Sequence, residues 1–152
     1  MDSTFNGLNR YNKITGLFQN HTANDTQADG LTHSSIWCIV KDNQGTLWLG
    51  TYFGGVNYFN PEYEIYTRYS YSSNEKKGLS NPVVGRTIED KDGNLWIGTE
   101  GGGLNYYNRR TREFKWYRPQ EGRNSISHNN VKALYYDADK EIIMDRHSFG
   151  RS

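Results

Sequence analysis

Four histidines and one cysteine are the side chains of this sequence with the widest chemical range. No two of the histidines, His21, His33, His128 and His147, have the i, i+4 spacing by which a helix presents two ligands to a metal. Cys38 stands alone, which excludes an internal disulfide and a cysteine-based zinc site. Nucleophilic catalysis needs a nucleophile, a base and an orienting group within reach, and no local segment supplies all three. We therefore expect no enzyme activity, no metal and no cofactor.

Composition and charge narrow the classes of partner. The 152 residues include 18 basic and 17 acidic side chains with the two signs interspersed, which argues against nucleic acid as a partner. No apolar run approaches the roughly 18 residues of a membrane span, and no basic start followed by an apolar stretch marks a signal peptide. Aromatic residues make up 14%, with 12 tyrosines among them, and this richness in rings favours strands over helices.

The sequence repeats itself with a period of about 48 residues. Residues 42–51 return as 90–99, so that Trp48 and Trp96 are 48 residues apart. A period of about 40–50 residues with strand-like content indicates propeller blades or another repeat array. The same offset of 48 relates three further segments, 7–12, 55–60 and 103–108.

Each period divides into four strands joined by turns. Asp-Gly at 92–93 and the glycines at 101–103 supply the positive φ that tight hairpin turns require. Four short antiparallel strands joined in this way form one blade. We therefore predict an all-β fold of four-stranded β-propeller blades, about three in the chain, without a helix. The strands predicted in one period cover 83–90, 95–99, 104–107 and 113–117.

We expect a single partial β-propeller over 1–152 that begins and ends within a blade. The predicted parts are an outer half-blade and linker over 3–29, blades over 30–77 and 78–124, and the start of a further blade over 125–152. In the last part, the repeat predicts the motif Leu-Trp-Ile-Gly-Thr, but the sequence does not contain it there. Codons can be chosen for this tail such that reading them one base later gives Leu-Leu-Trp-Ile-Gly-Thr. We therefore hypothesise a frameshift in the tail. The alternatives are a cloning scar and genuine divergence.

The two incomplete ends are complementary halves of one blade. Propellers usually need four to eight blades to close, and exposed strand edges pair with other chains. We therefore predict a homodimer in which the ends of two chains meet and give a six-bladed ring.

Repeated residues are expected to serve the blade itself. Trp48 and Trp96 are predicted to pack between blades. Asp42, Asp90 and Asp137 are predicted to accept hydrogen bonds from the turn that follows each inner strand.

The motif Asp-x-x-Gly-x-Leu-Trp-Ile-Gly-Thr, followed by Gly-Gly-Leu-Asn-x-x-Asn, resembles the two-component regulator propeller repeat. The resemblance covers about residues 7–137. It implies a fragment of the periplasmic sensor region of a Bacteroides-type hybrid two-component system, in which such blades form seven-bladed propellers. The usual role of these regions is to sense polysaccharide breakdown products, so the resemblance implies periplasmic signal transduction and carbohydrate sensing.

Residues that break the repeat are the candidates for ligand binding. Trp37, Gly85 and Lys132 share one position of the inner strand, and the preceding loops carry His33 and His128 at equivalent positions. Such loops converge at the mouth of a propeller's channel, where exposed rings suit sugar faces and charged groups suit hydroxyl or acidic groups. Ordinary surface variation is the alternative explanation. The full candidate set is His33, Trp37, Tyr52, Phe53, Arg86, Glu100, His128 and Lys132.

The predicted function is non-catalytic binding of an oligosaccharide by a sensor fragment. One alternative is a structural remnant without a ligand. The other is a propeller enzyme of the streptogramin lyase type, which His33 or His128 beside an acid and a bound cation would favour.

Overall fold

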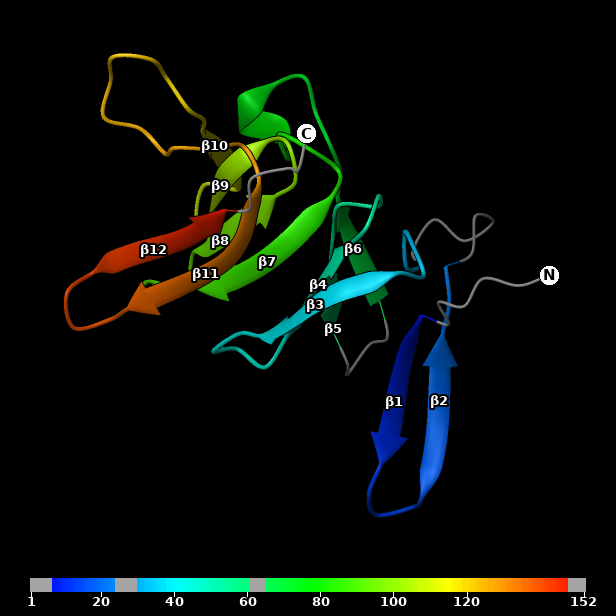
Figure 1. Ribbon diagram of the computed structural model, residues 1–152. Coiled ribbons are helices and arrows are strands. Elements are labelled where there is room, and N and C mark those ends of the chain that lie inside the picture. Colours follow the sequence, from blue (N-terminus) through cyan, green and yellow to red (C-terminus); the bar gives the residue numbers. More distant parts are fainter. Residues whose placement is uncertain (1–6, 24–29, 61–64, 148–152) are drawn as a thin grey trace.

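The computed structural model describes residues 7–23, 30–60 and 65–147 and places most of them in antiparallel strands (Figure 1). Two four-stranded sheets occupy the middle of the chain, and a two-stranded hairpin lies at each end. Parts of the predicted half-blade and linker (3–6 and 24–29) and of the tail (148–152) lie outside the described residues. The prediction of an all-β fold built from four-stranded blades is confirmed.

Each four-stranded sheet is a meander in which every strand pairs with the next along the chain. The pairing registers repeat, and the first strand of each sheet carries a bulge at the same position near its start. The strands are β3 (Ile36–Lys41), β4 (Leu47–Thr51), β5 (Val56–Asn60) and β6 (Ile65–Tyr69) in the first blade, and β7 (Val84–Glu89), β8 (Leu95–Thr99), β9 (Gly103–Asn108) and β10 (Glu113–Tyr117) in the second.

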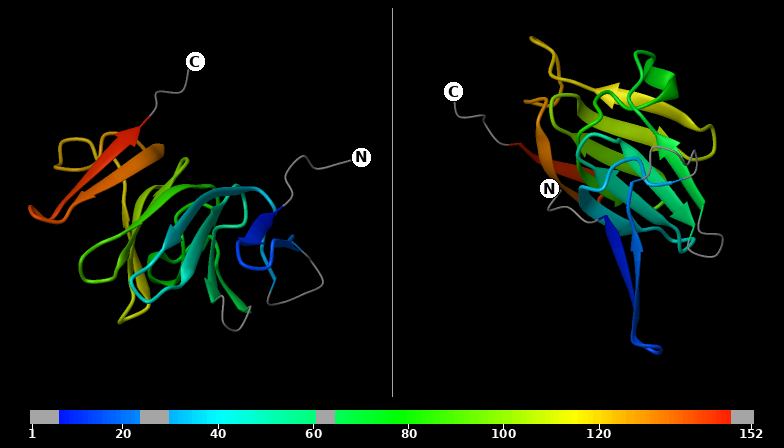
Figure 2. Two further views of the ribbon diagram at one scale, coloured as in Figure 1. Left: turned by 90° about the horizontal axis from the view of Figure 1, so that it is seen from below. Right: turned by 90° about the vertical axis from the view of Figure 1, so that its right-hand side faces the viewer.

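The two end hairpins are the two halves of a blade. The hairpin β1 (Leu8–Asn12) and β2 (Leu17–His21) has the register of the third and fourth strands of a full blade. The hairpin β11 (Val131–Asp137) and β12 (Ile142–His147) has the register of the first and second strands, including the bulge. The full blades lie between the two hairpins, which form opposite ends of the row (Figure 2).

One short helix corrects the prediction that the chain has none. The 3-10 helix η1 (Glu75–Lys77) lies in the connection between the two full blades. Asn74 caps it, because its side-chain oxygen accepts a hydrogen bond from the Lys76 amide at 3.1 Å. The helix is a single turn and contributes no buried residue to the core.

The core lies between successive sheets. The largest cluster joins the two full blades, and smaller clusters join each of them to its neighbouring hairpin. Trp48 is 2% exposed, and its ring centre lies 5.8 Å from that of Tyr69 and 5.9 Å from that of Tyr107 in the next blade. The predicted packing of Trp48 between blades is confirmed. Trp96 packs in the same way against the cluster that holds β11 and β12.

Glycines of the repeated motif allow the sheets to approach closely. A Cβ atom on Gly50 would lie 2.5 Å from Cys38 Sγ and 2.6 Å from Val84 Cγ1. A Cβ atom on Gly98 would lie 2.7 Å from Val131 Cγ1. All three distances are too short for real atoms, so these two positions accept only glycine unless a neighbouring strand shifts.

The segment that lacks the repeated motif still forms a strand. The register of β12 opposite β11 places Met144 where β8 has Trp96, and Arg146 where β8 has Gly98. Asp137 keeps part of the repeated turn, since its carboxylate accepts a hydrogen bond from the Lys140 amide at 3.2 Å. The last hairpin thus has blade geometry without the blade's Trp and Gly.

Candidate functional site

Three inner strands bring the repeat-breaking residues together. Strand β7 lies between β3 and β11 (Figure 1), so the shared sequence position places Gly85 between Trp37 and Lys132. Glycine has no side chain to separate its neighbours. The Lys132 ammonium group therefore lies 5.9 Å from the centre of the Trp37 ring, within the range of a cation–π interaction.

Three further aromatic rings extend from the Trp37 ring. The Tyr52 ring stacks on Trp37 with centroids 4.8 Å apart and an interplanar angle of 29°. Phe53 meets Tyr52 edge-on at 4.5 Å, and the His33 ring lies 6.3 Å from Tyr52. These rings are accessible, since Trp37 is 43%, Tyr52 38% and Phe53 56% exposed. Exposed rings in mutual contact form a preordered apolar surface next to a cation.

An ion pair completes this group. Lys132 Nζ contacts Glu100 Oε1, and both side chains remain partly accessible. The ammonium group thus touches a carboxylate and faces the Trp37 ring at the same time. We call the connected set of His33, Trp37, Tyr52, Phe53, Glu100 and Lys132 the rim cluster. It contains six of the eight residues predicted from the sequence.

Arg86 and His128 have surroundings of their own. Arg86 is exposed on β7, and its charge acts on the buried thiol of Cys38, whose pKa is raised by burial. His128 Nδ1 accepts a hydrogen bond from the Asn130 amide at 3.0 Å, as His33 Nδ1 does from Ser35. These bonds shape the turn before each inner strand and explain both histidines without a ligand.

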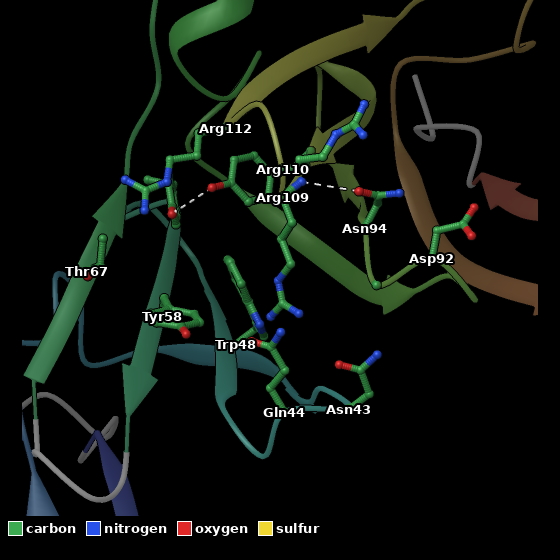
Figure 3. A pocket seen from close by; sticks show the side chains of 13 residues that line it. Asn43, Gln44, Trp48, Tyr58, Thr67, Asp92, Asn94, Arg109, Arg110 and Arg112 are labelled. Carbon is green, nitrogen blue, oxygen red and sulfur yellow. Dashed lines mark hydrogen bonds between the residues drawn. The ribbon is translucent and has the colours of Figure 1, made fainter.

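A second candidate site lies between the two full blades (Figure 3). It is at the strand ends opposite to those that carry the rim cluster. This pocket of about 560 Å³ lies where the β3–β4, β7–β8 and β9–β10 turns meet, and we call it the inter-blade pocket. Three of the four residues 109–112 are arginines. From the sequence, this segment predicts only a polar turn and not a pocket. Its lining residues are Asn43, Gln44, Trp48, Tyr58, Thr67, Tyr69, Asp92, Gly93, Asn94, Tyr107, Arg109, Arg110 and Arg112.

Arg109 is a clamp between the blades. Its guanidinium group donates to Asp42 Oδ2 of the preceding blade and lies 5.3 Å from the centre of the Trp48 ring. A further nitrogen lies 3.6 Å from Glu89 Oε1. Burial alone would raise the pKa of Asp42, but the hydrogen bonds from Trp48, the Thr46 amide and Arg109 outweigh it, so the pKa is lowered.

Neither candidate site contains a set of side chains that could coordinate a metal ion. Within residues 7–23, 30–60 and 65–147, no three His, Cys, Asp or Glu side chains gather in a way that would hold a metal ion. None of the helices in those residues is long and apolar enough to cross a membrane.

The architecture defines the class: these sheets are β-propeller blades. The family model described as two component regulator propeller matches residues 30–53 and 78–101, which span the first two strands of each full blade and the loop before them. The resemblance noted from the sequence is thereby confirmed at both repeats. No curated protein matches the chain.

Two solved structures share this fold. One is the extracellular domain of the putative hybrid two component system BT4673 from B. thetaiotaomicron, with a TM-score of 0.69 and 23% identity over 93% of this chain. The other is PorZ, a surface component of the type-IX secretion system of Porphyromonas gingivalis, with a TM-score of 0.64 and 18% identity over 82% of this chain. The matches cover 17% and 18% of those proteins, so this chain spans less than a fifth of either.

Proposed function

We propose that this chain is part of the sensor ectodomain of a hybrid two-component system and that its rim cluster binds an oligosaccharide without catalysis. The observation that carries the proposal is the stacked, exposed pair of Trp37 and Tyr52 beside the Lys132–Glu100 ion pair. The matching repeats and the likeness to a hybrid two component ectodomain support the sensor role. The same likeness supports a location outside the cytoplasm, in the periplasm or beyond.

The chemistry of the rim cluster suits a sugar. The apolar C–H face of a pyranose ring packs on an indole or phenol ring, while its hydroxyl groups need donors and acceptors nearby. Trp37, Tyr52 and Phe53 provide the rings. Lys132 provides donors, Glu100 provides an acceptor, and both lie at the edge of the aromatic surface.

The lyase-type alternative draws little support from the two histidines. Nδ1 of His33 and Nδ1 of His128 each accept a hydrogen bond from a backbone amide two residues away. A catalytic base needs its acceptor nitrogen directed at a substrate proton.

Isothermal titration calorimetry with cello-, arabino- and galacto-oligosaccharides tests the binding proposal. We expect one of these series to bind, and Trp37→Ala and Tyr52→Ala to weaken that binding on the order of tenfold. Tyr71→Ala is the matched control, since Tyr71 is 56% exposed and belongs to the connection after β6. A blank titration with all three series would favour a structural remnant without a ligand, and an equal loss in the Tyr71 variant would contradict binding at the rim cluster.

We propose further that two copies complete each other's end blades. Tyr11 and Phe18 form a ring pair with centroids 4.6 Å apart, like Phe59 and Tyr66 at 4.6 Å. The pair Phe59–Tyr66 is buried, whereas Tyr11 is 51% and Phe18 72% exposed. Pairing of β12 of one copy with β1 of the other would complete a four-stranded blade. Trp96 of the copy that supplies β12 would then lie over the exposed Tyr11–Phe18 pair of the copy that supplies β1.

Light scattering tests this assembly. We expect twice the 17.6 kDa chain mass, and a return to the single mass in Phe18→Asp. Ile14→Asp is the control, because Ile14 is 96% exposed at the tip of the same hairpin. A wild-type chain that stays at 17.6 kDa at high concentration would contradict the homodimer.

A further inference from the structure

We propose that the inter-blade pocket binds a small ligand through an oxyanion, held by Arg112 and by the paired hydroxyl groups of Tyr69 and Tyr107. The oxyanion is a carboxylate or a sulfate group on a sugar-sized molecule. This site lies at the opposite end of the strands from the rim cluster, and the inference does not rest on the function proposed there.

The pocket lining carries three arginines and one carboxylate. Arg109 is balanced by the carboxylate of Asp42, which it contacts directly. Glu89 lies 3.6 Å from the same arginine, and Arg110, Arg112 and Asp92 are the other charged residues of the lining. The volume of about 560 Å³ lies within the range of small-molecule sites.

Arg112 is the arginine available to a ligand. Within the described part of the chain, its guanidinium group forms neither a hydrogen bond nor an ion pair with another side chain. Figure 3 shows Arg112 and Arg110 extending to opposite sides of Arg109. Arg112 and Tyr69 both line the pocket, and the charge of Arg112 acts on the Tyr69 hydroxyl group.

The tyrosine pair adds neutral donors. The hydroxyl oxygens of Tyr69 and Tyr107 lie 2.9 Å apart, so one hydroxyl donates to the other and the second hydrogen remains for a ligand. Burial and the neighbouring Tyr107 raise the pKa of Tyr69, so its hydroxyl stays protonated at physiological pH. A guanidinium group beside phenolic donors is a suitable set for an oxyanion.

The backbone at Arg112 gives a second, independent observation. Arg112 has φ 58°, in the left-handed region that disfavours side chains, whereas the equivalent residue of the β1–β2 turn is Gly16 with φ 71°. Both turns start at an asparagine whose carbonyl accepts a hydrogen bond from this residue at 2.8 Å. Glycine serves the β1–β2 turn, so the turn itself does not require the arginine side chain.

The test compares Arg112→Gly with Glu141→Gly in the full 152-residue chain. Glu141 has φ 56° in the turn between β11 and β12, outside the pocket, and is a matched control for the backbone change. Galacturonate and galactose 6-sulfate are titrated calorimetrically into each variant, with neutral galactose as the reference probe. The tighter of the two acidic sugars identifies the oxyanion.

We expect both acidic sugars to bind more tightly than galactose, and Arg112→Gly to weaken them at least about tenfold. The same variant should melt about 2 °C higher, because glycine relieves the left-handed backbone. Glu141→Gly should leave the affinity unchanged, while Tyr107→Phe should lower it. Absence of binding by both acidic sugars, or equal affinities of the two glycine variants, would overturn the proposal.

Discussion

The indole nitrogen of Trp48 donates to a carboxylate oxygen of Asp42 at 2.8 Å, and Trp96 repeats this bond to Asp90 at 3.0 Å. The other oxygen of Asp42 accepts hydrogen bonds from the turn, including the Thr46 amide at 2.9 Å. One carboxylate therefore fixes both the hairpin turn and the ring that packs between blades. This bond explains why Asp and Trp recur together at a spacing of six residues.

Replacing Asp42 by alanine should destabilise the chain by roughly 3 kcal/mol, because it leaves Trp48, Arg109 and the turn amides without their buried acceptor. Asp90→Ala should cost about 1–2 kcal/mol, since Asp90 is half-buried and binds no arginine clamp. Urea denaturation of both variants measures the difference. Equal losses would show that the Arg109 contact contributes nothing.

Asp42 should also make stability depend on acid pH. Its folded-state pKa is lowered below the ordinary value of 3.8, so its contribution is complete above that value and is lost as pH falls through the lowered pKa. The stability gap between wild type and Asp42→Asn should therefore narrow below pH 3.8. Urea midpoints measured from pH 2.5 to pH 7 test this expectation, and a gap of constant size would contradict it.

Gly50→Ala should destabilise the contact between the two full blades by about 1–3 kcal/mol, because the added methyl group would overlap Cys38 Sγ and Val84 Cγ1. Val84→Ala removes one of the overlapping atoms. A double-mutant cycle should give a favourable coupling between the two changes. Purely additive losses would mean that the methyl group finds room elsewhere.

Asn57→Ala should cost about 2 kcal/mol and loosen the loop that carries His33. The Asn57 side chain is fully buried and exchanges two hydrogen bonds with Thr32, at 2.7 and 3.0 Å. Asn9 holds the equivalent position of the β1–β2 hairpin but is exposed and bonds to Asn20. Asn9→Ala should therefore change the stability of the single chain by less than about 0.5 kcal/mol. Thermal unfolding of the two variants gives the comparison.

Much of the fold follows from sequence periodicity because each blade repeats the same local chemistry. The strands predicted over 95–99 and 113–117 have those bounds in the structure, and the strands predicted over 83–90 and 104–107 differ by one residue at each end. The sequence does not predict η1, because a single turn of three polar residues carries no apolar period.

The sites were harder to predict because they depend on contacts that do not repeat. The aligned position of Trp37, Gly85 and Lys132 is visible in the sequence, but the cation over the ring appears only when the strands lie side by side. Arg109 reaches Asp42 across 67 positions of sequence and between two blades. No periodicity encodes that contact, so the inter-blade pocket has no counterpart among the predicted residues.

The central claim is that a sugar binds at the rim cluster, and the four indole N–H signals of the chain test it most directly. Three of these groups already donate within the protein, from Trp48 to Asp42, from Trp96 to Asp90 and from Trp116 to Gly78. Trp37 is 43% exposed in the rim cluster. The protein is titrated with the oligosaccharide that binds in calorimetry, and ¹⁵N–¹H correlation spectra are recorded. The Trp37 signal should shift while the other three indole signals stay in place. An unmoved Trp37 signal, or a shift confined to the other three, would contradict the account.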